Sequence, residues 1–331
     1  MESVWGVLDF FNVKYLFVGG SEDIQKYFKE FYLSINKVRT DHIAKTVYVR
    51  FIEHDSDLTC EIVEDDTTEL LPDLLFLSLR NEKIVCFCKD SWIIEEKEDL
   101  IEVRTNGRVF HFWDVLNQCL RDVITRNARK YGVIGLHAAC LQLAWGNVML
   151  FGLSGSGKST LSIGVGLHES NKLLSDDRVM FCYNEEHCYL TSFGFPITFR
   201  AGTSKICPEL RKYEENVPAI AFSDKDINYK YKVRVDYEDL FGYKRIYYLL
   251  DKLKYVFLQR DDSSVAHFEK MSDEELKSQI IDYWEQGEIV CNDVELLLSK
   301  IKGDSFKFIY PFGGEQAFRD NVHLLSNGPL V

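Results

Sequence analysis

The chain has 331 residues, of which 46% are hydrophobic and 27% are charged, so it is long enough for one large domain or two of ordinary size. Its 39 basic and 52 acidic residues give a net charge of −13, which disfavours nucleic acid and anionic lipid as partners. No apolar run approaches the roughly 20 residues that a membrane-spanning helix needs. Six prolines and the lack of a low-complexity tract argue against long linkers.

The nine cysteines are odd in number, and the first residues lack the basic and apolar regions of a signal peptide. We therefore expect reduced thiols and a cytoplasmic protein. Cys86 and Cys88 are too closely spaced for a usual zinc pair, and alternating strand residues are the better interpretation.

The N-terminal third of the chain is predicted to be rich in strands, with a few helices. Apolar residues at helical spacing predict a helix over 24–33, and strands are predicted over 14–18, 46–52, 74–79 and 84–88. Asn106-Gly107 stands between two strand-like segments, 100–104 and 108–112, which predicts a hairpin. Since no catalytic constellation is visible here, residues 1–112 are expected to form an accessory α+β domain.

Residues 113–331 are predicted to form an α/β nucleotide-binding domain. It opens with a helix over 113–131, which Gly132 ends, and a strand over 133–143. Ser272 and Glu275 form a capping box that predicts a helix to about residue 285. Later strands are predicted over 179–183, 189–193, 197–200, 230–235, 246–250 and 255–260. Residues 310–314 signal a loop, which either covers a site or ends a strand.

One segment holds every fixed position of the phosphate-binding pattern G-x-x-x-x-G-K-S, between an apolar strand at 148–151 and a helical stretch at 161–168. Its glycines allow positive φ, so that backbone N–H groups can close on phosphate oxygens at a helix N-terminus. Lys158 is expected to reach the β- and γ-phosphates of ATP, and Ser159 to bind Mg²⁺. The alternative is a glycine-rich turn without a ligand. The predicted nucleotide site comprises Gly152, Leu153, Ser154, Gly155, Ser156, Gly157, Lys158, Ser159 and Thr160.

Two adjacent carboxylates, Asp176 and Asp177, follow this loop by one predicted helix and a short apolar run. One could hold Mg²⁺ and the other could accept the proton of an attacking hydroxyl, although Ser-Asp-Asp-Arg is also ordinary turn composition. His137 lies in an apolar strand, where a histidine is more often a core residue than a ligand. Three strand cations are candidates to stabilise a transferring phosphoryl group: Arg200, Lys232 and Arg234.

Taken together, the segments 136–139, 148–160 and 174–178 resemble the catalytic domain of the HPr kinase/phosphorylase family, in particular the smaller HPr-kinase-like proteins, which include the kinases of lasso-peptide gene clusters. The resemblance implies a nucleotide-binding core with a mixed β-sheet, related to that of ATP-dependent phosphoenolpyruvate carboxykinase. It also implies transfer of a phosphoryl group from ATP to a serine hydroxyl. Asp176 would be the general base, Asp177 the Mg²⁺ partner, and His137 would match the family's histidine.

The family's signature segment after the aspartates is not found in this chain, so phosphorylase activity and HPr as substrate are left open. Thr160 also stands where the family has an acidic residue. The expected activity is an ATP- and Mg²⁺-dependent kinase acting on a hydroxyl of a peptide, protein or small molecule. Two alternatives stay open, an ATP-binding regulatory protein without turnover and an enzyme of the phosphoenolpyruvate carboxykinase type. The acceptor's identity and self-association are left open.

Overall fold

The structure is a computed structural model that describes residues 3–10, 13–32, 45–53, 76–80, 83–87, 92–105, 113–153, 155–183, 188–193, 197–213, 232–243, 248–250, 252–262, 265–282, 298–299 and 303–329. The chain has a mixed α/β fold and divides into two compact units, residues 1–134 and 135–331. The sequence placed the division at residue 112, ahead of helix α2 (Trp113–Arg129). The structure groups this helix with the N-terminal unit.

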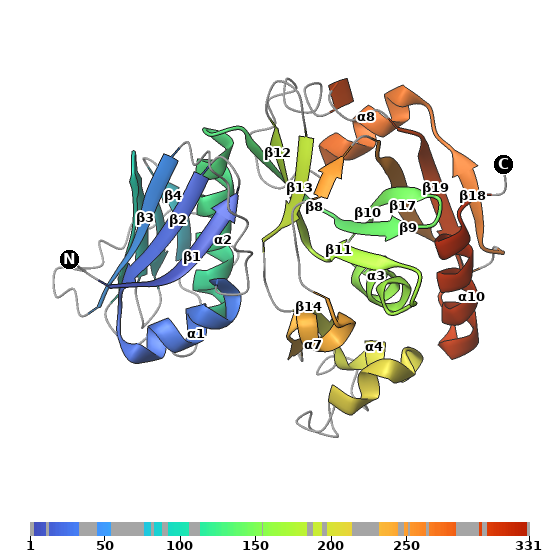
Figure 1. Cartoon of the computed structure of the whole chain (residues 1–331), viewed down its shortest axis with the longest axis horizontal. Helices are drawn as coiled ribbons and strands as arrows, with labels where there is room; N and C mark the ends of the chain where they lie inside the picture. The colour runs from blue at the N-terminus through green and yellow to red at the C-terminus, as the bar shows by residue number, and fades with distance from the viewer. Residues whose placement is uncertain are drawn as a thin grey trace. The chain divides into compact units, whose positions relative to one another are not determined.

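The N-terminal unit is built on a seven-stranded mixed sheet (Figure 1). The strand order is β1-β2-β3-β7-β6-β5-β4, and only the pairs β2–β3 and β3–β7 are parallel. Its strands are β1 (Val4–Phe10), β2 (Val13–Gly19), β3 (Lys45–Ile52), β4 (Phe76–Arg80), β5 (Lys83–Phe87), β6 (Trp92–Lys97) and β7 (Leu100–Thr105).

The two helices described in this unit pack on the same face of the sheet. In α1 (Glu22–Tyr32), the Phe28 ring lies 4.9 Å from that of Phe51 on β3, measured between ring centroids. In α2, Asn127 accepts a 2.8 Å hydrogen bond from Tyr15, which is the register partner of Val47 on β3. Val47 and Phe51 point the same way from their strand, as residues four apart must. The opposite face carries partly exposed polar residues and Tyr48.

The hairpin predicted across Asn106-Gly107 is not available to β7, because β3 and β6 already pair with its two edges. Residues 106–112 themselves lie outside the described part of the chain. The turn that does reverse the chain is Glu98-Asp99, between β6 and β7. The sequence analysis missed β6, because its charged residues Glu95, Glu96 and Lys97 hide the alternation that marks a strand.

The second unit contains a six-stranded mixed sheet in the order β11-β9-β10-β17-β19-β18. The central strands β10, β17 and β19 are parallel, and the pairs outside them are antiparallel. Its strands are β9 (Ala139–Leu143), β10 (Gly146–Phe151), β11 (Lys172–Ser175), β17 (Lys254–Arg260), β18 (His267–Lys270) and β19 (Ser305–Tyr310).

Helices α3 (Lys158–Gly166) and α10 (Gly314–Asn327) share one hydrophobic core with this sheet (Figure 1). They approach closely because Gly164 has no side chain, since a Cβ there would overlap the Phe318 ring. Helix α8 (Asp273–Asp282) begins with the predicted capping box. Ser272 Oγ accepts from the Glu275 N–H at 3.2 Å, and the Glu275 carboxylate accepts from the Ser272 N–H at 3.1 Å.

Smaller sheets complete the unit, one in the order β16-β13-β12-β8 and one of β14 with β15. The single strand predicted over 133–143 is therefore wrong. The chain leaves β8 at His137 and enters β9, in another sheet, at Ala139, with the Ala138 N–H bonded to Leu136 O at 3.0 Å. The remaining elements are β8 (Val133–His137), β12 (Arg178–Tyr183), β13 (Cys188–Ser192), β14 (Ile197–Arg200), β15 (Lys232–Val235), β16 (Tyr248–Leu250), α4 (Ala201–Ile206), the 3₁₀ helix η2 (Pro208–Tyr213) and α7 (Tyr237–Phe241).

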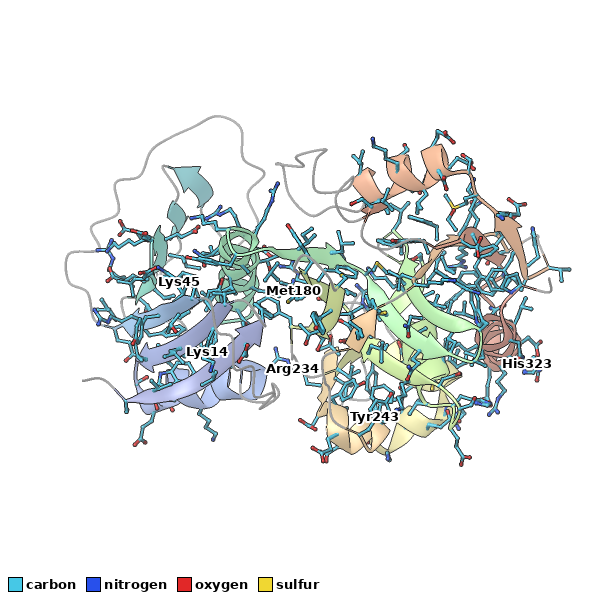
Figure 2. The ribbon with its side chains drawn as sticks, turned by 45° about the horizontal axis from the view of Figure 1, so that its top comes forward. Lys14, Lys45, Met180, Arg234, Tyr243 and His323 are labelled. Carbon is cyan, nitrogen blue, oxygen red and sulfur yellow. The ribbon has the colours of Figure 1, made fainter. Side chains whose placement is uncertain are left out.

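Strand β11 lies at an edge of the six-stranded sheet, and two tyrosines occupy its outer backbone groups. Tyr243, labelled in Figure 2, accepts a hydrogen bond from the Leu173 N–H at 2.7 Å. Tyr237 donates to the Leu173 carbonyl. Within the described residues, no helix is long and apolar enough to span a bilayer.

Glu96 is a buried carboxylate at the contact between β6 and α2. It accepts hydrogen bonds from Lys130 Nζ at 2.6 Å, Asn127 Nδ2 at 2.8 Å and Arg126 Nη2 at 3.1 Å. Burial by itself raises the pKa of Glu96, but the hydrogen bonds from Lys130 and Asn127 and the charges of Lys130 and Arg126 outweigh burial and lower it. The ionised carboxylate is thus the form that the fold stabilises.

We predict that Glu96→Gln lowers the free energy of unfolding of the N-terminal unit by about 2 kcal/mol at neutral pH, because it removes charge-assisted hydrogen bonds. A carboxylate with a lowered pKa stabilises the fold above its unfolded pKa and loses that contribution as the pH falls. The difference between wild type and variant should therefore shrink below about pH 4. Hydrogen exchange of the backbone amides of β2 and α2 in urea measures this difference in unfolding free energy. A loss that is independent of pH, or an equal loss in the exposed-residue control Glu98→Gln, would contradict the prediction.

Candidate functional site

One edge of the six-stranded sheet collects the ends of five strands. Ala139 at the start of β9 pairs with Leu150 near the end of β10, and Ser175 at the end of β11 pairs with Cys140. Because β17 and β19 run parallel to β10, their carboxyl ends, Arg260 and Tyr310, lie at the same edge. Ligands of α/β sheets bind outside the carboxyl ends of parallel strands, so this edge is where a site is expected.

The strand, glycine-rich turn and helix predicted around residues 152–160 are present. β10 ends at Phe151 and α3 begins at Lys158. The Ser156 N–H bonds to the Leu153 carbonyl at 2.9 Å and closes a turn in which Gly155 has φ 84°. Gly157, with φ 83° and ψ 11°, is the N-cap of α3. Two of the three residues 155–157 have a left-handed backbone conformation, which favours glycine, and both are glycines of the motif. Ser154 lies outside the described residues.

The N-terminus of α3 has the features of an anion site. No side chain in the described part of the chain caps it, and its first turn holds no acidic residue. Its first N–H groups therefore point outward with the positive end of the helix dipole. Ser156 Oγ is buried and has no hydrogen-bond partner among the described residues. An unsatisfied buried hydroxyl inside this loop fits a ligand with phosphate oxygens.

Strand β19 holds the loop in place from the other side. Its last residue, Tyr310, is fully buried and donates its hydroxyl hydrogen to the Ser156 carbonyl. Burial raises the pKa of Tyr310, which keeps the phenol protonated and able to donate. A Cβ at Gly157 would lie 2.8 Å from this hydroxyl oxygen, and a Cβ at Gly152 would overlap Ser156 Oγ. The glycines therefore provide space as well as backbone freedom.

Two chain corners meet next to the loop. The chain passes from β8 to β9 at His137, and from β11 to β12 at Asp176-Asp177. Both corners join the six-stranded to the four-stranded sheet, and His137 Nε2 lies 3.3 Å from Asp177 Oδ1. Ser175 Oγ donates to the Arg178 carbonyl at 2.8 Å and closes the second corner. The sequence separated these residues by 40 positions, and the sheet pairing brings them together.

Lys158 connects this pair to the loop. Its side chain is only 7% exposed, and its Nζ donates a 3.4 Å hydrogen bond to the backbone carbonyl of His137. The structure therefore brings together three of the predicted site residues, His137, Lys158 and Asp177. An ammonium group at the helix N-terminus, beside backbone amides, is suited to hold phosphate oxygens.

The two aspartates differ in exposure, as adjacent residues at a turn should. Asp176 is 7% exposed, whereas the Asp177 side chain is 41% exposed. In the described residues no group of three or more His, Cys, Asp or Glu side chains is placed to hold a metal ion alone. Mg²⁺ that arrives with a nucleotide needs only one or two carboxylates in addition to the phosphates. Ser159 and Asp177 are oxygen donors of the right chemistry for such a complex.

The three predicted strand cations belong to the two-stranded sheet. Arg200 ends β14 and leads directly into α4, whose Thr203 hydroxyl lies 3.2 Å from the Thr160 hydroxyl. The β14–α4 segment thus borders the first turn of α3. Lys232 is the register partner of Arg200 on β15, and Arg234, labelled in Figure 2, is exposed on the same strand.

The sequence analysis missed the residues that the C-terminal strands bring to this edge. These are Tyr310, which braces the loop, and Arg260 and Phe312, which lie beside it. The loop signal at residues 310–314 was the available indication. It left open whether the segment covers a site or ends a strand, and the structure shows that it ends β19 and leads into α10.

No protein-family model matches the chain, and no curated protein matches it. Among solved structures, it is similar to the Hpr(Ser) kinase/phosphatase from Coxiella burnetii, with 12% sequence identity and a TM-score of 0.28. The match covers 58% of this chain and 94% of that one.

The two left-handed glycines predict different responses to alanine. At Gly155 a Cβ meets no atom within 4 Å, so Gly155→Ala should cost only the backbone strain of about 1 kcal/mol. At Gly157 the methyl group must also displace Tyr310, so Gly157→Ala should cost about 3 kcal/mol. Urea unfolding of the two purified variants measures the difference. Equal losses would contradict the packing of Tyr310 against the loop.

Proposed function

We propose that this protein is an ATP- and Mg²⁺-dependent phosphotransferase that moves the γ-phosphoryl group to a hydroxyl, with serine in a peptide or protein as the expected acceptor. One observation carries the proposal. A loop with two left-handed glycines opens an uncapped helix, whose first lysine is directed to the corner that holds His137 and Asp177. The nucleotide-binding core is assigned to the second unit, and the mixed sheet is proposed to be of the HPr kinase and phosphoenolpyruvate carboxykinase type.

The loop residues bind the nucleotide in this proposal. The N–H groups of 155–160 and the Lys158 ammonium surround the β- and γ-phosphates, and the buried Ser156 hydroxyl gains a partner. Mg²⁺ enters as the complex with ATP, and Ser159 and Asp177 supply protein oxygens to it. Phosphoryl transfer requires positioning and charge stabilisation more than covalent chemistry from the protein.

Asp176 is proposed as the general base. The acceptor oxygen forms a bond to the γ-phosphorus while the bond to the β–γ bridging oxygen breaks, and ADP leaves with that electron pair. The hydroxyl proton passes to the Asp176 carboxylate. His137 is a positioning residue in this scheme, because its imidazole contacts the Asp177 carboxylate and its carbonyl contacts Lys158. Arg200 and the β15 cations Lys232 and Arg234 are proposed to meet the acceptor or its phosphate.

The direct test uses ATP whose γ-phosphoryl oxygens are ¹⁸O. A dephosphorylated, heat-treated lysate is incubated with the protein and this ATP, and phosphopeptides that carry the heavy label are identified by mass spectrometry. We expect heavy phosphoserine in samples with wild-type protein. ATP that binds but yields no labelled acceptor would instead support a regulatory ATP-binding protein, and manganese-dependent turnover of oxaloacetate would support a carboxykinase.

We predict that Lys158→Ala lowers phosphoryl transfer by about a thousandfold, because it removes the ammonium that neutralises charge developing on the phosphates. The protein should remain folded, as judged by its circular dichroism spectrum. The matched control is Lys270→Ala, a lysine on edge strand β18. Retained transfer in Lys158→Ala would reject the role of this residue.

Asp176→Asn is predicted to lower kcat by about 100- to 10,000-fold with little change in the KM for ATP, because the amide cannot accept the hydroxyl proton. Asp177→Asn should instead raise the Mg²⁺ concentration needed for half-maximal rate. Initial rates over a matrix of ATP and Mg²⁺ concentrations separate the two. If both variants changed kcat and KM alike, the proposed division between base and metal partner would be wrong.

A further inference from the structure

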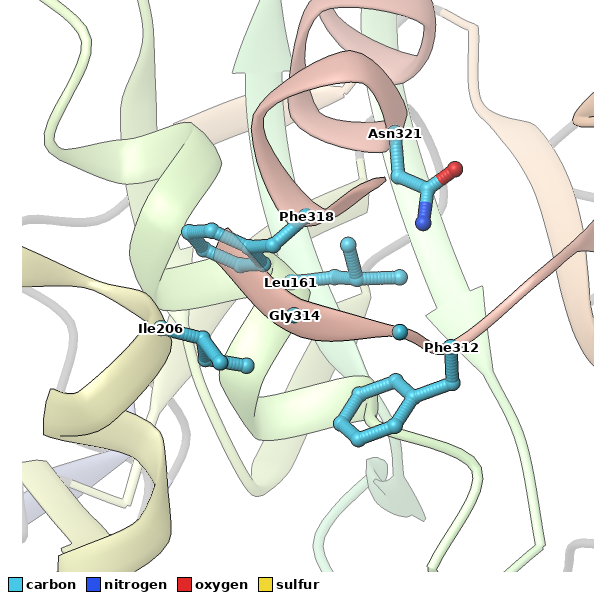
Figure 3. A pocket seen from close by; sticks show the side chains of 7 residues that line it. Leu161, Ile206, Phe312, Gly314, Phe318 and Asn321 are labelled. Atoms are coloured by element: carbon cyan, nitrogen blue, oxygen red, sulfur yellow. The ribbon is translucent and has the colours of Figure 1, made fainter. Parts of the chain in front are cut away.

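The aromatic ring of Phe312 lies at the mouth of the loop, next to the N-terminus of α3. A Cβ at Gly157 would be 3.5 Å from Cε2 of this ring. Phe312 also lines a shallow depression with Leu161, Ile206 and Phe318, of about 220 Å³ including the open space at its mouth (Figure 3). Phe312 is 36% exposed, which leaves apolar surface in water beside the predicted phosphate site.

Two side chains fix the backbone at Phe312. Asp262 accepts a hydrogen bond from the Phe312 N–H at 2.9 Å. Asn321 on α10 donates to the Pro311 carbonyl at 2.9 Å. The segment between β19 and α10 is thus tied to the end of β17 and to the helix that follows. An exposed aromatic ring on a tethered backbone is preorganised to receive a flat ligand, since little conformational entropy is lost when it binds.

A guanidinium group lies over the same ring. Arg260 Cζ is 4.8 Å from the centroid of the Phe312 ring. Asp262 holds the guanidinium there through hydrogen bonds from Arg260 Nε at 3.0 Å and Nη2 at 2.7 Å. These bonds, followed by the bond from the Phe312 amide, lower the pKa of Asp262 to about 2, so the carboxylate is ionised over the physiological pH range. The Arg260 side chain is itself 44% exposed.

We propose that the exposed sides of Phe312 and Arg260 form a stacking surface for the base of the nucleotide whose phosphates bind at residues 152–160. The inference rests on the proposed function and specifies where the nucleoside lies. Aromatic rings and guanidinium planes are the two side-chain surfaces on which bases stack. A Cβ at Gly157 would be in van der Waals contact with the Phe312 ring, and Arg260 lies over that ring, so the surface begins beside the phosphate loop.

The alternative occupant of an exposed phenylalanine is the acceptor substrate, and the position of the pair argues against it. Asp176, proposed for proton transfer, and Asp177, proposed to bind Mg²⁺, lie at the corner between β11 and β12. The stacking surface is formed by Arg260, the last residue of β17, and Phe312, which follows β19, and both strands lie on the other side of β10 in the sheet order. Acceptor and base would thus approach the loop from opposite sides of β10.

The test compares two ligands that share a phosphate chain and differ in the base, MgATP and magnesium tripolyphosphate. Calorimetric titration is done with wild type, Phe312→Ala, Phe312→Trp and the control Leu249→Ala, which truncates an exposed apolar residue on β16. Phe312→Ala should weaken MgATP about tenfold, the usual effect of losing one stacked base, and leave tripolyphosphate unchanged. Phe312→Trp should bind MgATP at least as well as wild type, because another flat aromatic ring at this position can also stack on the base.

Equal weakening of both ligands by Phe312→Ala, or MgATP affinity that is unchanged in this variant, would overturn the stacking surface and leave the proposed phosphotransferase in place. Failure of the wild type to bind either ligand would overturn the proposed function, and the stacking surface with it. If Leu249→Ala weakened MgATP binding as much as Phe312→Ala does, the effect would not be local to the loop, and the stacking surface would also be overturned.

Discussion

Strand β9 pairs with β10 on one side and with β11 on the other, both antiparallel, and this pairing brings the candidate site together. It places the start of β9 and the end of β11 at the carboxyl end of β10, where the glycine loop begins. Both flanking segments then turn into the four-stranded sheet, so the side chains at the two corners, His137 and Asp177, are neighbours. The antiparallel pairing of β9 with β10 also places the backbone carbonyl of His137 beside the start of α3, where Lys158 contacts it.

The glycine loop is also held by a strand that lies more than 150 positions later in the sequence. Tyr310 donates to the Ser156 carbonyl, and the absence of a side chain at Gly157 makes room for the phenol. The loop is therefore shaped by its own left-handed residues and by the packing of β19. Such double support matters for phosphoryl transfer, since an error of about 1 Å in position can lower the rate a hundredfold.

Local signals in the sequence predicted most elements of the fold. Apolar periodicity correctly predicted α1, α2 and several of the strands between β2 and β17. The capping box predicted at Ser272 is present with both of its hydrogen bonds. The break at Ala138 could not be predicted, because residues 133–143 are apolar apart from His137 and Gln142, and no turn signal marks the change of sheet. The dipeptide Asn106-Gly107 favoured a hairpin that the parallel pairing of β7 with distant β3 excludes.

The parts of the candidate site that are continuous in the sequence could be predicted from it. The loop at 152–160 and the aspartates at 176–177 are short patterns with their own chemistry. The contact of Arg260 with Phe312 depends on the register between β17 and β19, two parallel strands that are far apart in the sequence. Register between distant strands is set by the packing of the whole sheet, so no local pattern reports it.

The tyrosines at the rim of β11 determine how the second unit can meet other chains. An outer strand with free backbone groups can pair with a strand of another molecule. At Leu173 both of those groups are occupied by phenols, so an incoming strand would have to displace Tyr237 and Tyr243 first. The outer strand at the far rim, β18, is four residues long and ends in Glu269 and Lys270. Strand addition is thus disfavoured at both rims of the six-stranded sheet.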